Sequence, residues 1–76
     1  MSPKLPVVSS LDLIKALQKI GYKVVRQKGS HIRLRNYNDP QRKPITVPNH
    51  KELKPGLLRN ILNSAELSVE KFTKLL

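Results

Sequence analysis

The first part of the chain has the hydrophobic pattern of a helix with one buried face. Four apolar residues recur every three or four positions: Leu13, Ile14, Leu17 and Ile20. This spacing is typical of an amphipathic helix. Ser9 or Ser10 is a suitable N-cap, and Gly21 is a stop signal after the last apolar position. The pattern predicts a helix over residues 10–20.

A hairpin is predicted next. Residues 22–27 are rich in strand-forming side chains, with Val24 and Val25 at their centre. Lys28-Gly29-Ser30 predicts the turn, because glycine tolerates a positive φ. Residues 31–36 form the second strand, since their side chains alternate between polar and apolar.

The alternation in the second strand assigns a face to each side chain. Ile32 and Leu34 point to one face of the predicted sheet. The side chains that point to the opposite face are His31, Arg33 and Arg35. Because helices cover the apolar face, the histidine and the two arginines are expected on the open face.

The rest of the sequence, from residue 37 onward, predicts one more strand and two helices. Ile45 and Val47 alternate as a third strand, which follows a loop over residues 37–43. Pro55 suits the first turn of a second helix, and Ser68 is the cap of a short last helix. The apolar stripe of the second helix is Leu57, Leu58, Ile61, Leu62 and Ala65. The predicted order is α-β-β-β-α-α, an α+β fold with a three-stranded antiparallel sheet and helices on one face.

Length and composition narrow the class of protein. The chain has 76 residues, so we expect one domain over residues 1–76. It has no cysteine, which excludes disulfides and thiolate zinc sites. No apolar run approaches the roughly 18 residues that span a bilayer, and the first ten residues lack the apolar core of a signal peptide. We therefore expect a soluble protein of the cytoplasm with no membrane partner.

The charge points to a polyanionic partner. Fifteen basic and five acidic residues give a net charge of +10, and such an excess opposes compaction unless a polyanion neutralises it. Nucleic acid is the first candidate, an acidic protein the second and an anionic membrane the third. Between residues 26 and 43 Asp39 is the one acidic residue. The basic residues of the same segment are Arg26, Lys28, Arg33, Arg35, Arg42 and Lys43.

The ionisable residues do not suggest a metal or cofactor site. A catalytic cation needs several converging carboxylates. The five acidic residues are spread over predicted helices and loops: Asp12, Asp39, Glu52, Glu66 and Glu70. His31 and His50 are too few to fill a zinc site. We expect neither a metal nor a small-molecule cofactor.

His31 is the candidate catalytic residue. Ser30 precedes it, but adjacent strand residues point to opposite faces, so a Ser-His nucleophilic pair is disfavoured. Imidazole can give and take protons near neutrality. RNA supplies its own nucleophile, the 2′-hydroxyl beside the scissile phosphate, so that one histidine among cations suffices for slow cleavage. DNA lacks that hydroxyl and should not be cut.

Two groups of residues are candidates for binding the RNA phosphates. Arginine grips phosphate oxygens in a fork, and the backbone of a turn can also hold an anion. The group around the hairpin is Lys28, Gly29, Ser30, Arg33 and Arg35. Lys51 and Lys54 form the other, at the start of the second helix, where the helix dipole assists them.

Four segments of the chain resemble the HicA family of mRNA-interferase toxins. Residues 13–35, with their Gly29-Ser30-His31 signature, resemble that family's first helix and hairpin. ITVPNH (45–50) resembles its third strand, ELKPGLLRNIL (52–62) its second helix and AELSVEKFTKLL (65–76) its closing segment. The resemblance implies a fold like that of a double-stranded-RNA-binding domain. It also implies an mRNA-cleaving endoribonuclease with its essential histidine at His31, neutralised by an acidic HicB-type antitoxin that covers His31.

Two further hypotheses remain open from the residues alone. One is a basic RNA-binding module without catalysis, since no second acid–base group is evident near His31. The other is an interaction protein whose cationic face serves only an acidic partner. For His50, the alternative to a catalytic role is a structural or capping role. For Tyr37, the alternative to stacking on a base is that of an ordinary exposed loop residue.

Overall fold

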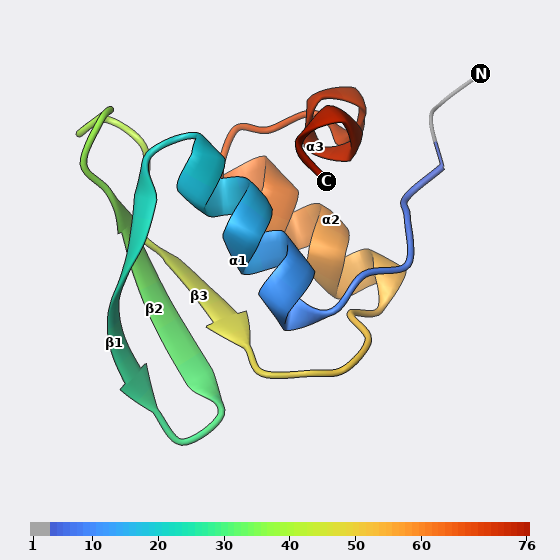
Figure 1. Ribbon diagram of the computed structural model, residues 1–76, viewed down its shortest axis with the longest axis horizontal. Coiled ribbons are helices and arrows are strands. Elements are labelled where there is room, and N and C mark those ends of the chain that lie inside the picture. The colour runs from blue at the N-terminus through green and yellow to red at the C-terminus, as the bar shows by residue number, and fades with distance from the viewer. Residues whose placement is uncertain (1–3) are drawn as a thin grey trace.

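Six elements follow one another in the order that the sequence predicts. The structure is a computed structural model that describes residues 4–76. The elements are α1 (Ser10–Lys19), β1 (Tyr22–Lys28), β2 (His31–Asn36), β3 (Ile45–Pro48), α2 (Pro55–Ser64) and α3 (Val69–Leu75) (Figure 1). The predicted α+β fold is confirmed. No helix within the described range has the length and apolar character needed to cross a membrane.

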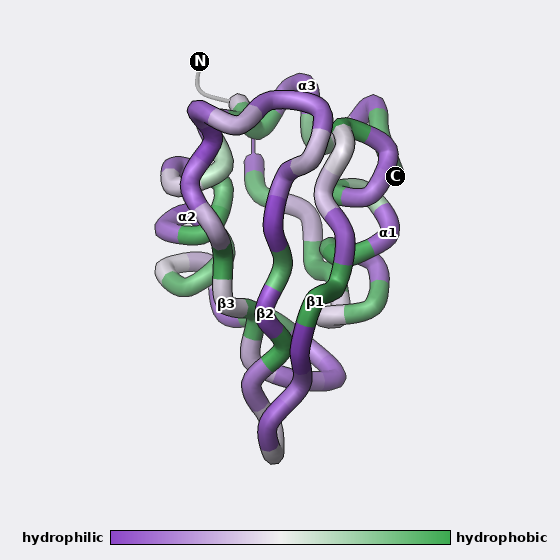
Figure 2. Tube along the Cα trace, turned by 90° about the vertical axis from the view of Figure 1, so that its left-hand side faces the viewer, coloured by the Kyte–Doolittle hydropathy of each residue, from purple (hydrophilic) through white to green (hydrophobic). Residues whose placement is uncertain are grey.

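The three strands form an antiparallel sheet that is covered on one face only. The strand order is β1-β2-β3. Figure 2 shows the sheet in front with α1 and α2 behind it, so the face toward the viewer carries no helix. Ile32 and Leu34 are buried beneath the helices, whereas the other face of β2 is exposed. The predicted division of β2 into a covered and an open face is confirmed.

The core lies between the sheet and the helices. Each element contributes side chains to one continuous apolar cluster. The largest fully buried members are Tyr22, Phe72, Leu13, Leu17, Leu34, Leu58, Leu62 and Val47. Burial of one such side chain contributes about 1.5–3 kcal/mol to folding. This cluster fixes the covered face of the sheet and so determines which side chains of β2 remain in solvent.

Tyr22 combines burial with a hydrogen bond at the start of β1. Its hydroxyl donates to the Lys43 carbonyl oxygen at 3.0 Å. Burial raises the pKa of the Tyr22 phenol, so the group remains a neutral donor. The bond connects β1 to the loop that precedes β3.

Two neighbouring serines have separate tasks at the start of α1. Ser9 is the N-cap, and its hydroxyl accepts from the Asp12 backbone N–H at 3.1 Å in a capping box. Ser10 lies inside the helix and is buried. Its hydroxyl donates to the Pro48 carbonyl and accepts from the His50 backbone N–H at 2.7 Å. Ser10 therefore ties α1 to the segment that leaves β3.

The turn between α1 and β1 requires a glycine. Gly21 has φ +101°, and a Cβ there would lie 2.7 Å from Cβ of Asn38. Asn36 closes the same turn, because its side-chain Nδ2 donates to the Ile20 carbonyl at 3.0 Å. Its Oδ1 accepts from the backbone N–H groups of Asn38 and Asp39.

The hairpin turn is shorter than predicted. Lys28 is the last residue of β1 and pairs with His31, which leaves Gly29 and Ser30 as a two-residue turn. Gly29 has φ +59°, as expected of glycine at the first central position of a type II′ turn. The prediction of a three-residue turn that included Lys28 was wrong by one residue.

Candidate nucleic-acid interface

A bulge in β1 determines which side chains share a face with His31. Val24 pairs with Leu34, but the next pair is Arg26 with Arg33, so Val25 is an extra residue in β1. Strict alternation from buried Tyr22 would place Arg26 on the covered side. The extra residue reverses the alternation and turns Arg26 to the open face.

Basic side chains stand opposite each other along the open face. Residues directly opposite in an antiparallel ladder point to the same side. The cross-strand partners on this face are Lys23 with Arg35, Arg26 with Arg33, and Lys28 with His31. All of these side chains are exposed. We call this set of Lys23, Arg26, Lys28, His31, Arg33 and Arg35 the cationic face.

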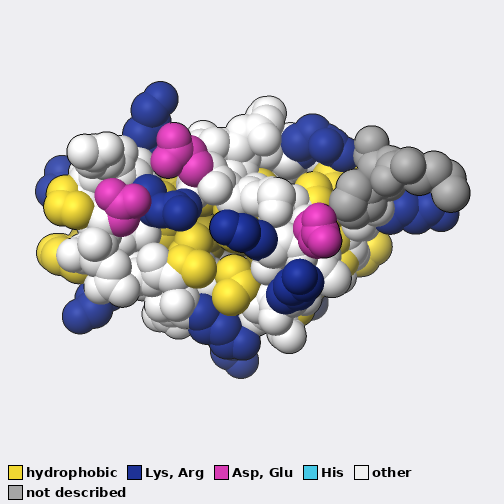
Figure 3. All heavy atoms as spheres, turned by 90° about the horizontal axis from the view of Figure 1, so that it is seen from above, with side chains coloured by type: hydrophobic (Ala, Val, Ile, Leu, Met, Phe, Trp, Pro, Cys, Tyr) yellow, Lys and Arg dark blue, Asp and Glu magenta, His cyan; other side chains and the backbone are white. Residues whose placement is uncertain are grey.

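The cationic face lowers the stability of the free protein. Like charges directly opposite one another destabilise a sheet. No aspartate or glutamate occurs in β1, β2 or β3 to compensate them. Figure 3 looks at the opposite end of the molecule from the β1–β2 turn, and there acidic side chains are interspersed with basic ones. Such an arrangement fits a polyanion that lies on the sheet.

A broad, shallow pocket of about 870 Å³ lies over this face. Its charged and titratable side chains come from both strands of the hairpin: Arg26, Lys28, His31, Arg33 and Arg35. Gly29 and Ser30 of the turn line it, together with Val25 and Thr46. The structure therefore brings the hairpin candidates together around one concave surface.

Arg33 is held in place within this pocket. Its Nη1 donates to Oγ1 of Thr46 on β3 at 2.9 Å, and Thr46 is its partner across the ladder. The remaining donors of the Arg33 guanidinium are free to bind phosphate oxygens. His31 is flanked on its other side by Pro48 of β3, so the imidazole faces two strands that bear no acid.

Lys51 and Lys54 lie outside this pocket. Both are exposed in the segment before α2. Lys54 is the N-cap residue of α2 and makes no side-chain cap hydrogen bond. The two lysines are accessible to a phosphate, but they form a group separate from His31.

His50 has a structural role through its backbone. Its N–H donates to the Ser10 hydroxyl, and its carbonyl accepts from the Ser10 N–H at 3.0 Å. The His50 side chain is exposed and does not line the pocket. These hydrogen bonds involve the backbone of His50 alone.

Two residues of the cationic face, Lys23 and Arg26, are not among the site candidates predicted from the sequence. A three-residue turn over 28–30 would have paired Gln27 with His31 and turned Arg26 toward the helices. The two-residue turn shifts the ladder by one position. The available signal was the turn itself, since a Gly-Ser pair suits a two-residue hairpin.

Across residues 4–76, no three histidine, aspartate or glutamate side chains gather closely enough to hold a metal ion. The acidic residues occupy helices and loops rather than strands. Asp39 pairs with Arg42 at 3.4 Å, at the far end of the sheet from the turn. The chemistry available at the pocket is therefore that of imidazole and cationic side chains.

Comparison with known proteins identifies one family. The sequence model described as "HicA toxin of bacterial toxin-antitoxin" matches residues 11–67, which span α1, the sheet and α2. No curated protein and no solved structure matches the chain.

Proposed function

The chain belongs to the HicA family of toxins from bacterial toxin–antitoxin systems, and from that premise we propose that it is an endoribonuclease that cleaves mRNA. His31 is the general acid–base. Lys28, Arg26, Arg33 and Arg35 bind the phosphate. No resident metal or cofactor is needed, because the 2′-hydroxyl of the RNA is the nucleophile.

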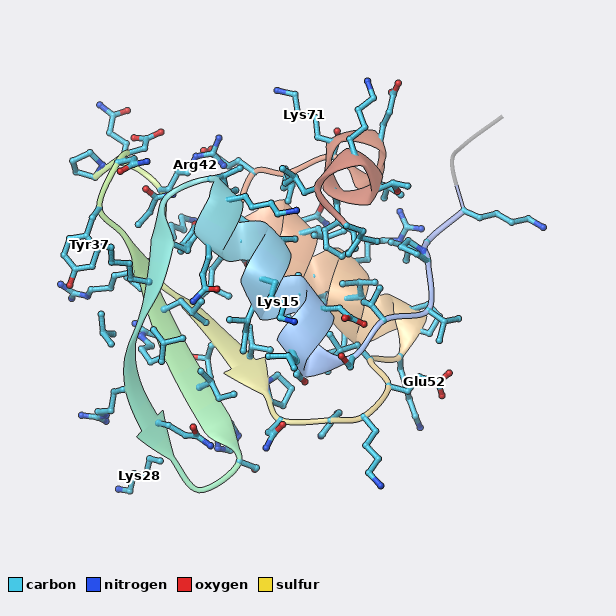
Figure 4. All side chains as sticks on the ribbon, in the orientation of Figure 1. Lys15, Lys28, Tyr37, Arg42, Glu52 and Lys71 are labelled. Atoms are coloured by element: carbon cyan, nitrogen blue, oxygen red, sulfur yellow. The ribbon has the colours of Figure 1, made fainter. Side chains whose placement is uncertain are left out.

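The observation that carries this proposal is the position of His31. Its side chain is exposed, points to the uncovered face of β2 and lines a pocket whose charged side chains are all lysine and arginine. Lys28 stands directly opposite it in the ladder. Figure 4 labels Lys28 at the tip of the hairpin, away from the helices, where a polynucleotide can approach without displacing any element.

The proposed reaction is an intramolecular transesterification. The neutral imidazole of His31 takes the proton of the 2′-hydroxyl, and O2′ attacks the adjacent phosphorus. The bond from phosphorus to O5′ breaks, and O5′ takes a proton from water. The protonated His31 returns its proton to the hydroxide so formed, which restores the neutral imidazole. The products are a 2′,3′-cyclic phosphate and a 5′-hydroxyl. The arginine forks stabilise the charge that develops on the phosphorane oxygens.

The expected rate is modest. General acid–base catalysis by one side chain contributes about 10²–10⁴-fold, and the cationic side chains add electrostatic stabilisation. An enzyme of this kind turns over slowly. DNA of the same sequence is bound through its phosphates but is not cut.

As a toxin of this family the chain pairs with an antitoxin. We propose that the antitoxin is an acidic protein of the HicB type that places carboxylates on the cationic face and covers His31. The open side of the sheet offers such a protein an unobstructed basic surface. Inhibition then follows from occupation of the phosphate site.

The test is cleavage of single-stranded RNA in EDTA by the wild-type protein and by two matched variants. His31→Ala removes the proposed acid–base group, whereas His50→Ala removes an exposed histidine outside the pocket. We expect cleavage by wild type and His50→Ala, with cyclic phosphate ends, and none by His31→Ala. Equal cleavage by His31→Ala, or no cleavage by wild type, would refute the assignment.

A second candidate function is RNA binding without catalysis. The observation that favours it is the composition of the pocket, which is lined by His31 but by no second histidine and no carboxylate. RNA retained by the wild-type protein with no cyclic phosphate products would support this alternative. Salt dependence does not separate the two functions, because both require phosphate contacts.

A further inference from the structure

A second hollow adjoins the pocket around His31 on the open face. It is lined by Arg35, Asn36, Tyr37, Pro40, Arg42 and Pro44. Arg35 also lines the first pocket, so the two surfaces are continuous along β2. The second hollow therefore extends the cationic face away from the hairpin turn.

Tyr37 presents an aromatic ring at this hollow. The residue is 61% exposed, although its neighbour Asn36 is buried. Nζ of Lys23 lies 5.8 Å from the centroid of the ring, and Lys23 is the cross-strand partner of Arg35 on the cationic face. In Figure 4 the Tyr37 ring lies on the outer side of the sheet, away from the helices.

The combination of an exposed ring with flanking cations is that of a single-stranded nucleic-acid subsite. A base stacks on an aromatic side chain, while the cations hold the adjoining phosphates. Lys23 lies over one face of the ring, and the exposure of the residue leaves the other face to a base. Arg35 is placed to bind a phosphate between Tyr37 and His31.

We propose that Tyr37 stacks a nucleobase of the RNA whose scissile phosphate lies at His31; this subsite rests on the proposed function. Tyr37 is six residues from His31 along the chain. At about 3.3 Å per residue of strand this corresponds to about 20 Å. The stacked base is therefore several nucleotides from the cut, and the toxin prefers single-stranded RNA, because a paired base cannot stack on the ring.

Stacking of a base on Tyr37 can be measured without cleavage of the RNA. The chain has two tyrosines and no tryptophan, and Tyr22 is buried in the core. In the His31→Ala background, a single-stranded RNA should quench the tyrosine fluorescence on binding. Tyr37→Phe in the same background should keep the affinity, since phenylalanine retains the stacking surface. It should lose the quench, because the fluorescent tyrosine at position 37 is gone.

The matched pair for affinity is Tyr37→Leu and Leu11→Ala, both at exposed positions. Loss of one base–aromatic stack weakens binding by about 5- to 150-fold, so Tyr37→Leu should lose that much affinity and Leu11→Ala should lose none. RNA with single abasic sites then maps the subsite. At one abasic position, wild type and Tyr37→Leu should bind equally.

The results of these experiments distinguish failure of the Tyr37 subsite from failure of the proposed nuclease function. Quenching and an abasic-sensitive position without any cleavage would support the subsite and refute the nuclease. Cleavage by wild type with Tyr37→Leu unchanged on every RNA would refute the subsite alone. A Tyr37→Leu protein that binds RNA normally but fails to bind the antitoxin would also overturn the subsite, because the ring would then be a protein contact.

Discussion

Arg26 lies directly opposite Arg33 across the β1–β2 ladder, and a single extra residue, Val25, is the reason. Two guanidinium groups in this position repel each other. This repulsion is relieved when an anion binds between the two guanidinium groups. The pair is thus evidence about the partner as well as about the sheet.

Arg26→Gln should weaken RNA binding without destabilising the fold. The variant removes one phosphate contact and one repulsive pair, so the slope of log K against log salt should become shallower by about 0.7. Lys15→Gln, on α1 (Figure 4), removes the same charge from the other side of the molecule. Salt titrations by fluorescence anisotropy and thermal melts compare the two. Identical behaviour of the two variants would contradict the assignment of Arg26 to the interface.

Lys51 and Lys54 should affect binding but not the chemical step. They are exposed before α2 and do not line the pocket around His31. The double variant Lys51→Ala/Lys54→Ala should bind RNA more weakly, yet cleave at the wild-type rate once RNA is saturating. Single-turnover kinetics over a range of protein concentrations give both quantities. A lower saturated rate would place the lysines within reach of the scissile phosphate.

Gly21→Ala should destabilise the protein more than Gly29→Ala. Both glycines have a positive φ, which costs a residue with a Cβ about 1–2 kcal/mol. At Gly21 the new Cβ also meets Asn38, whereas at Gly29 nothing lies within 4 Å. Urea unfolding of the two variants measures the difference. Equal losses would mean that the turn after α1 relaxes without cost.

Ser10→Ala should reduce the free energy of unfolding by about 1–3 kcal/mol, the cost of buried polar groups left without partners. The substitution removes the partner of the Pro48 carbonyl and of the His50 N–H. Ser64→Ala, at an exposed position of α2, should change stability by less than about 0.5 kcal/mol. A Ser10→Ala protein as stable as Ser64→Ala would show that water replaces the hydroxyl.

The elements were predictable because each has a local signal. The helical spacing around Leu13 and Leu17, the alternation of β2 and the caps at Ser9 and Ser68 all depend on neighbours in sequence. The burial of Ile32 and Leu34 follows from the same alternation. The fold class and the open position of His31 could therefore be predicted without coordinates.

The register of the hairpin could not be predicted from the same patterns. The Gly29-Ser30 pair indicates the length of the turn, but the bulge at Val25 is set by pairing between strands. An error of one residue moves a side chain to the opposite face. This is why Arg26 was missed and why Lys28 was placed in the turn rather than opposite His31. The contact between Ser10 and His50 joins residues 40 positions apart, and no local pattern indicates it.

The cationic face also links the stability of the toxin to the molecule that is bound on it. Any anionic molecule that binds only the folded chain raises its stability by mass action, whether that molecule is RNA or the antitoxin. The unbound toxin is then the least stable of its forms and the one most open to proteolysis. Loss of the bound anion therefore leaves the repulsion within the cationic face unrelieved and lowers the free energy of unfolding of the toxin.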